Sequence, residues 1–155
     1  MEKYRVLRDT REHVDGDGWW FDESELCLGT VVQGLKTGDY TIEGLEDVLC
    51  IERKASTGEF AKNITEGRFE RELERMELFK YPFMILEFTI QDILTFPKNS
   101  SIPQYKWQYL KITPQFMMKR FIEYQLKYKT KIITTGKFHG QQVTSSIFKR
   151  VVNEQ

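Results

Sequence analysis

The sequence predicts a single α/β domain that covers residues 1–155. Six short apolar segments have the length and composition of strands, and three longer segments repeat apolar residues at helical spacing. The chain is 40% hydrophobic and 14% aromatic, which is enough apolar material for a core and is not typical of disordered proteins. Because no internal repeat, low-complexity tract or linker divides the chain, we expect one unit in which helices cover a sheet.

The strands are expected near residues 4–9, 29–36, 40–43, 47–54, 82–89 and 130–135. The run Val48-Leu49-Cys50-Ile51 is typical of a buried strand, since it is short, apolar and partly β-branched. Gly29, Gly38 and Gly44 separate the first four segments, and glycine favours turns. This punctuation predicts that the first four strands form an antiparallel meander.

Three helices are expected, over residues 57–80 with a break at Gly67, over 114–128, and over 139–153. Thr113-Pro114 begins the second helix with a capping hydroxyl and a proline at the first helical position. The apolar stripes are Phe69, Leu73 and Met76 in the first helix, Met117, Phe121, Tyr124 and Tyr128 in the second, and Val143, Ile147 and Val151 in the third. Such stripes usually pack inward on a sheet. The last two are also broader than one small core needs, and they predict a homodimer through these two helices.

The segment Tyr105–Lys111 mixes aromatic and basic residues after a surface loop at residues 99–103. Its aromatic side chains could stack on splayed bases of a nucleic acid. The same alternation also occurs in amphipathic core strands, and that interpretation is favoured here.

Acidic residues stand at the ends of three expected strands, namely Asp9, Asp39 and Glu52. Residues two apart in a strand face the same side, so Glu52 and Lys54 project into one site while Arg53 points away. Mg²⁺ is usually held by one or two carboxylates together with phosphate oxygens. The pattern indicates metal-dependent cleavage of a phosphodiester, with Lys54 beside the attacking water. A Gly-Asp pair is also a common turn, so the motif alone leaves a structural role open.

The motifs resemble those of the nuclease domain of XPF-type, structure-specific DNA endonucleases, a branch of the PD-(D/E)xK restriction-endonuclease-like superfamily. The matching segments are, in order, Asp9-Thr10-Arg11-Glu12, Gly38-Asp39-Tyr40, Glu52-Arg53-Lys54, Gly67-Arg68 and the apolar run Pro82–Phe88. Two positions depart from the family pattern. The acid that normally follows the lysine by four residues is Gly58 here, with Glu59 one position later, and a glutamine that often follows Gly-Arg is Glu72.

The resemblance implies a restriction-endonuclease-like three-layer αβα fold with a central mixed sheet, and an Mg²⁺-dependent DNA endonuclease, with Mn²⁺ as a substitute ion. It implies branched or flapped DNA as the substrate. Asp9, Asp39, Glu52 and Lys54 are then the catalytic residues, with Asp39, Glu52 and, as a further candidate, Asp9 at the metal. The resemblance places Arg11, Glu12, Arg53, Glu59 and Arg68 around them as supporting residues. Arg68 would either pair with a carboxylate or contact a phosphate.

Two other functions stay open. The family includes subunits whose metal-site residues have decayed, so a non-catalytic DNA-binding or scaffold subunit is one alternative. The second is another PD-(D/E)xK nuclease, such as an exonuclease or a restriction-type enzyme. Members of the family commonly carry a helix-hairpin-helix or helicase module, and we expect neither here. The presence of Asp9, Asp39, Glu52 and Lys54 favours an active enzyme.

The net charge of zero hides an asymmetry between the two parts of the chain. Residues 1–102 contain 21 acidic and 13 basic residues, whereas residues 103–155 contain 2 acidic and 10 basic residues. Basic helix faces are often simply solvated. An acidic metal site followed by a basic surface also suits the binding of a phosphate backbone, and the sequence favours this interpretation, with DNA as the partner.

The remaining features concern the compartment and the cysteines. No apolar run is long enough for a membrane span, and the N-terminus lacks the apolar core of a signal peptide, so we expect an intracellular protein that does not insert in membranes. Cys27 and Cys50 are too few for a disulfide framework or a zinc site and are expected to be reduced. His13 and His139 have no ligand spacing.

Overall fold

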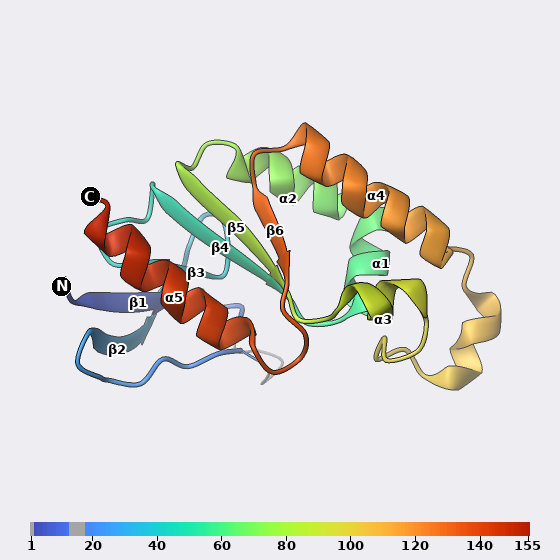
Figure 1. Ribbon diagram of the computed structural model, residues 1–155, viewed down its shortest axis with the longest axis horizontal. Helices are drawn as coiled ribbons and strands as arrows, with labels where there is room; N and C mark the ends of the chain where they lie inside the picture. The colour runs from blue at the N-terminus through green and yellow to red at the C-terminus, as the bar shows by residue number, and fades with distance from the viewer. Residues whose placement is uncertain (1, 13–17) are drawn as a thin grey trace.

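A six-stranded mixed sheet lies between helices in the computed structural model, which describes residues 2–12 and 18–155. Figure 1 shows α5 on one face of the sheet and the other long helices beyond its opposite face, so the predicted three-layer α/β fold is confirmed. The elements are β1 (Tyr4–Arg8), β2 (Cys27–Val32), β3 (Tyr40–Ile42), β4 (Leu49–Lys54), α1 (Thr57–Thr65), α2 (Arg68–Met76), β5 (Tyr81–Leu86), α3 (Ile90–Leu94), the 3₁₀ helix η1 (Gln104–Tyr109), α4 (Pro114–Lys127), β6 (Lys131–Thr134) and α5 (Gly140–Asn153).

The strand order is β2-β1-β3-β4-β5-β6. Strands β4, β5 and β6 are parallel, and β3 runs antiparallel to both β1 and β4. The predicted meander of the first four strands is wrong, because β2 lies on the outer edge of β1 and runs parallel to it, with Val6 opposite Thr30. A parallel pair cannot be joined by a tight turn. Part of the long connection is instead core, since Trp19 and Phe21 are buried there.

The two faces of the sheet carry separate cores, as the alternation of side chains along a strand requires. In β5, Met84 and Leu86 belong to the core that packs under α1, α2 and α4, while Ile85 belongs to the core covered by α5. Phe148 and Val151 of α5 close that second core.

The helix boundaries follow the sequence signals. Gly67 has a φ of 70°, a left-handed conformation that glycine adopts easily, and it separates α1 from α2 as predicted. Thr113 caps α4 by accepting a hydrogen bond of 3.1 Å from the backbone N–H of Phe116. The α4 stripe Met117, Phe121 and Tyr124 is buried in the monomer. This stripe therefore packs inward, and the large apolar side chains that α4 exposes are Phe116, Ile122 and Leu126.

The segment Tyr105–Lys111 is not a core strand. Residues 104–109 form η1, in which no side chain is buried. The turn is held by Trp107, whose indole N–H donates to the carbonyl of Ile102 at 2.9 Å. This anchor lies close to Pro103, which begins the turn, so the chain coils where the alternation predicted an extended strand.

Three smaller expectations concern the remainder of the chain. Cys27 and Cys50 are both free and buried. Within residues 2–12 and 18–155, no helix combines the length and apolarity that crossing a membrane requires. His13 lies outside the described residues, so the expectation about it stays a prediction.

Candidate active site

Three strand ends meet because β3 is antiparallel to both of its neighbours. The start of β3 therefore lies beside the ends of β1 and β4. The backbone N–H of Asp9 donates to the carbonyl of Asp39 at 2.8 Å, and the N–H of Asp39 donates to the carbonyl of Ile51 at 2.8 Å. These bonds bring Asp9, Asp39 and the Glu52–Lys54 segment together, as the sequence predicted. The side chains line one polar hollow of about 310 Å³.

Gly38 makes this approach possible. Its φ is 86°, and a Cβ at this position would lie 2.6 Å from Cys50 Sγ on β4. A residue with a side chain would both strain the backbone and collide with the neighbouring strand. The glycine of the Gly38-Asp39-Tyr40 motif therefore sets how closely Asp39 approaches β4.

Asp39 and Glu52 are two carboxylates in this hollow, and their hydrogen bonds and the nearby cation offset only part of the cost of burying their charges. One oxygen of Asp39 accepts a hydrogen bond of 2.8 Å from the backbone N–H of Arg53. Burial outweighs this bond and the charge of Lys54, and it raises the pKa of Asp39 to about 6. Burial, together with the Asp39 and Glu72 carboxylates, raises the pKa of Glu52 well above its ordinary value. The pair thus favours a proton or a cation between its oxygens.

Lys54 is buried on the same face of β4 as Glu52. Its ammonium lies 2.8 Å and 3.0 Å from the two carboxylate oxygens of Glu72 and 3.6 Å from Glu52 Oε1. Burial alone would lower the pKa of Lys54, but the Glu52 and Glu72 carboxylates outweigh it and raise the pKa. Lys54 is therefore a charged, oriented donor at the edge of the hollow.

Asp9 differs from Asp39 in how its carboxylate is used. One of its oxygens accepts from the N–H of Leu35 at 2.8 Å, and the other accepts from Arg11 Nε at 2.7 Å. Burial would raise the pKa of Asp9, but these hydrogen bonds outweigh burial and lower it. The carboxylate thus fixes the loop before β3, and it also lies at the wall of the hollow.

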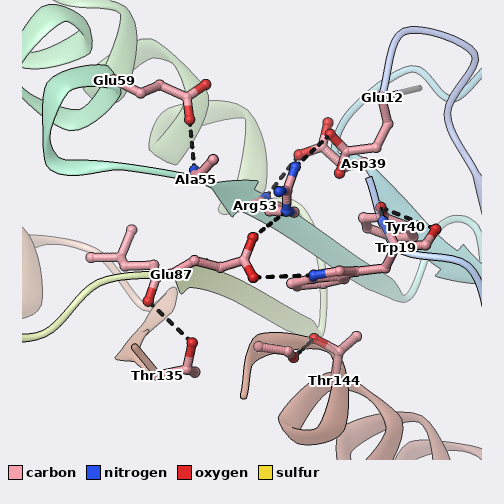
Figure 2. A network of polar contacts seen from close by, with 12 residues as sticks. Glu12, Trp19, Asp39, Tyr40, Arg53, Ala55, Glu59, Glu87, Thr135 and Thr144 are labelled. Atoms are coloured by element: carbon pink, nitrogen blue, oxygen red, sulfur yellow. Dashed lines mark hydrogen bonds and ion pairs between the residues drawn. The ribbon is translucent and has the colours of Figure 1, made fainter. Parts of the chain in front are cut away.

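Arg53 points to the opposite side of β4, where it joins two acids (Figure 2). Its guanidinium pairs with Glu87, just after β5, and with Glu12 Oε1 at 3.4 Å. Trp19 donates its indole N–H to the other oxygen of Glu87 at 3.2 Å, and its ring stacks on Tyr40 at 5.0 Å. Arg53 and Glu12, both expected as supporting residues, thus pair with each other in a network that ties β3, β4 and β5 together.

Glu12 and Glu59 occupy different environments on the rim. Burial and the charge of Asp39 raise the pKa of Glu12 to about 8, against the opposing charge of Arg53. Glu59 is exposed, and it accepts a hydrogen bond of 2.8 Å from the N–H of Ala55 while its own N–H binds Ser56 Oγ at 3.2 Å. The Ser56 hydroxyl thus caps the start of α1, and the Glu59 carboxylate holds the residue before that cap. Glu59 thus stabilises the junction between β4 and α1.

Arg68 and Arg11 are two of the exposed cations that line the hollow, together with Lys36 and Arg75. Arg68 begins α2 and lies 3.3 Å from Glu72, with 62% of its side chain exposed. Arg11 pairs with Asp9 and is 74% exposed. Both guanidinium groups can be reached by a phosphate in solution, although each already contacts one carboxylate.

The oxygen atoms of this hollow include possible ligands for a divalent cation. Among the described residues, no three His, Cys, Asp or Glu side chains are grouped so that they could hold a metal ion by themselves. Asp39 and Glu52 supply two carboxylates of raised pKa, and the remaining positions of an octahedral ion are commonly filled by carbonyls, waters and substrate phosphate oxygens. The residues therefore fit a hard ion such as Mg²⁺ that is completed by substrate.

Sequence reasoning missed several partners of these residues. Glu72 was identified from the sequence as a departure from the family pattern, and its bond to Lys54 was not predicted. Glu87 and Trp19 had no assigned role. Glu87 directly follows β5, which is parallel to β4, so its place beside Arg53 could have been inferred from that position. Nothing in the sequence marked Trp19, because its contact depends on how the connection from β1 to β2 folds.

The family model of the ERCC4 domain matches residues 8–139. The chain belongs to the ERCC4 domain family. This match confirms the resemblance to the XPF-type nuclease domain, a family of DNA endonucleases. No curated protein matches the chain.

Two solved structures share the fold. XPF from Aeropyrum pernix superposes with a TM-score of 0.64 at 21% identity, over 97% of this chain and 66% of that one. XPF from the same organism in complex with DNA gives a TM-score of 0.64 at 20% identity, over 98% and 66% of the two chains. The chain thus spans slightly less than two thirds of the length of these structures.

Proposed function

We propose that this ERCC4 domain is a divalent-metal-dependent DNA endonuclease that hydrolyses phosphodiester bonds in branched or flapped DNA. The observation that carries the proposal is the meeting of Asp39, Glu52 and Lys54 in one hollow, at the start of β3 and the end of β4. Two carboxylates of raised pKa beside an oriented ammonium are suited to bind an ion and a phosphate together. Membership of the family supports the same chemistry.

Asp39 and Glu52 would hold Mg²⁺, or Mn²⁺ in its place, with Asp9 and the carbonyl of Arg53 as further candidate ligands. When bound, such an ion polarises the phosphate and makes water more acidic. Lys54 would donate hydrogen bonds to the attacking water or to the phosphate oxygen on which charge develops. Glu72 keeps the ammonium of Lys54 charged and directed into the hollow.

The Arg53 network would serve this chemistry indirectly. Because Arg53 follows Glu52 and precedes Lys54, anchoring its side chain to Glu87 and Glu12 fixes the backbone from which both functional side chains project. Its backbone N–H also holds Asp39. The network thus acts as a support for the metal-binding pair.

The experiment is cleavage of a panel of labelled flaps, forks, four-way junctions, linear duplex and single strands with Mg²⁺. We expect the branched substrates to be cut, Mn²⁺ to replace Mg²⁺, and EDTA to stop the reaction. Equal cutting of linear duplex would remove the preference for branches and leave a general nuclease. Binding without any cleavage would favour a scaffold subunit.

We also propose a homodimer, for which the apolar contacts would come from the side chains that α4 leaves exposed. Leu126 is 84% and Ile122 is 48% exposed. Sedimentation of the wild type and of Leu126→Glu tests this, since Leu126 is not part of the monomer core. A wild type that sediments as a monomer at micromolar concentration would exclude the dimer under those conditions.

A further inference from the structure

The 3₁₀ helix η1 displays aromatic rings that the monomer core does not use. Tyr105 and Tyr109 lie four residues apart in η1, and they are 70% and 73% exposed. A single exposed apolar residue needs no explanation. Here, however, two tyrosines share one short element in which no side chain is buried, and Trp107 anchors the element through a hydrogen bond to Ile102. The rings are therefore presented to solvent on an ordered turn.

Along the chain, the segment around η1 carries charges of one sign. Between Asp92 and Glu123 the chain contains no acidic residue, and it contains five basic ones, namely Lys98, Lys106, Lys111, Lys119 and Arg120. The ammonium of Lys106 lies 5.8 Å from the ring centre of Tyr105, and Lys111 is exposed two residues after η1. Such a combination of flat rings and cations matches a ligand that offers both bases and phosphates.

A physical connection joins η1 to the candidate active site. The carbonyl of Ile102, which anchors Trp107, belongs to a loop that lines a second hollow of about 410 Å³. This loop is held against α1, since the backbone N–H of Gly58 donates to the carbonyl oxygen of Ser100 at 3.1 Å. A Cβ on Gly58 would lie 2.3 Å from that carbonyl oxygen, so the close approach requires glycine.

The two hollows share walls. Glu12, Arg53 and Glu59 line both the second hollow and the polar hollow that contains Asp39 and Glu52. In the view of Figure 1, η1 lies at the end of the molecule toward which β4 points. The second hollow therefore joins the first one to the loop that anchors Trp107 of η1, which is the route expected for a bound strand of nucleic acid.

We propose that η1 and the residues after it form a binding site for single-stranded nucleic acid. Bases stack on Tyr105 and Tyr109, and phosphates contact Lys106 and Lys111. The site takes a single strand because the bases of a duplex are stacked on each other and do not offer free faces to the rings. The binding of a single strand at η1 does not depend on the proposed function. Only the role of this site, which is to hold the unpaired arm of a branched substrate, rests on that function.

The test is the affinity of the full chain for fluorescent oligo(dT) of about 15 nucleotides, measured by anisotropy in EDTA. The Tyr105→Ala/Tyr109→Ala variant should bind on the order of tenfold more weakly than wild type. The matched control is Tyr105→Phe/Tyr109→Phe, which keeps both rings and should retain the affinity. All three proteins should bind a blunt duplex equally, and their melting temperatures should agree, since neither ring is buried.

Two results would overturn the proposal. One is wild-type affinity of the alanine pair for the single strand, and the other is an equal loss for single strand and duplex. A second variant, Lys106→Ala/Lys111→Ala, should lower the salt slope of single-strand binding by about 1.4, or about 0.7 for each phosphate. An unchanged slope would contradict the assignment of the lysines.

The same measurements separate this inference from the proposed function, because binding is measured without a divalent ion. A chain that cuts DNA while its alanine pair binds like wild type loses this inference alone. A chain that cuts no DNA with Mg²⁺, yet needs the rings for single-strand binding, loses the proposed function alone.

Discussion

The two faces of β4 carry charges in opposite arrangements. On one face, Glu52 lies beside Asp39, and the carboxylates outnumber the one buried ammonium, Lys54. On the other face, Arg53 sits between Glu87 and Glu12 in a network that also binds Trp19. The faces are one residue apart in sequence, yet one concentrates negative charge and the other distributes it over fixed partners.

This difference separates a functional site from its support. Buried acids whose pKa is raised destabilise the folded state at neutral pH, so their presence needs a purpose such as binding a cation. On the other face Glu12 also has a raised pKa, of about 8, but Arg53 pairs with Glu87, and Trp19 binds the second oxygen of Glu87. A buried pair that is satisfied by several hydrogen bonds in this way fixes geometry instead. Substitutions on the two faces should therefore have opposite consequences for stability and activity.

The largest effect on stability is expected on the support face. Arg53→Met leaves Glu87 and Glu12 without their partner, and breaking a buried pair in this way costs about 3–5 kcal/mol. Urea unfolding at neutral pH measures the loss. A cost below about 1 kcal/mol would mean that the network behaves like a surface pair and does not support β4.

The largest effect on activity is expected on the other face. Lys54→Met should lower single-turnover cleavage by about 10²–10³, since it removes a donor aimed at developing charge. Binding of DNA, measured without a divalent ion, should stay close to wild type, and the exposed Lys80→Met serves as the control. A loss of binding that parallels the loss of turnover would make Lys54 a phosphate anchor.

Asp39→Asn should remove activity and yet stabilise the metal-free protein. The pKa of Asp39 is about 6, against an ordinary value of 3.8. Below pH 3.8 both the folded and unfolded states hold the proton, so burial of this carboxyl has no ionisation cost. As pH rises toward 6, the unfolded state releases the proton first and stability falls.

Above pH 6 the cost is complete, and asparagine avoids it while it still accepts the hydrogen bond from Arg53. The gain in unfolding free energy should be on the order of 1 kcal/mol at pH 7 and should vanish near pH 4. Chemical unfolding in EDTA at both pH values measures it. A variant that is less stable than wild type at pH 7 would show that Asp39 is held for structure.

The smallest effect is expected at Arg68, which is exposed beside Glu72. Arg68→Ala should change the unfolding free energy by less than about 1 kcal/mol, because surface pairs contribute little. If Arg68 contacts a phosphate, the salt slope of DNA binding should fall by about one. An unchanged slope with a clear loss of stability would instead assign Arg68 to the ion pair.

Most of the regular elements could be predicted from local chemistry, although the short helix α3 and the 3₁₀ helix η1 were not. Gly67 interrupts the helix, and Thr113-Pro114 begins α4, because each acts through its own backbone conformation or capping bond. The convergence of Asp9, Asp39 and Glu52 was also foreseen, since their motifs sit at strand ends. In both cases the signal lies within a few residues of the feature that it specifies.

The predictions that were wrong concern features that depend on contacts between distant segments. The position of β2 follows from a connection that buries Trp19 and Phe21, and no local pattern specifies on which side of β1 it returns. The alternation in Tyr105–Lys111 is the same for a strand and for a displayed turn, and the anchor of Trp107 on Ile102 decides between them. Likewise, Glu72 was recognised as a departure from the family, but its bond to Lys54 requires the packing of α2 on β4.

The central claim is that the acidic face of β4 exists to bind a divalent cation. Calorimetric titration of Mg²⁺ and Mn²⁺ into wild type, Asp39→Asn and Glu52→Gln tests it most directly. Glu59→Gln is the matched control, because its carboxylate binds the backbone of Ala55 and an amide oxygen can accept the same bond. We expect binding in wild type and in the control, and its loss in both other variants. Unchanged titration curves in Asp39→Asn and Glu52→Gln would contradict the account.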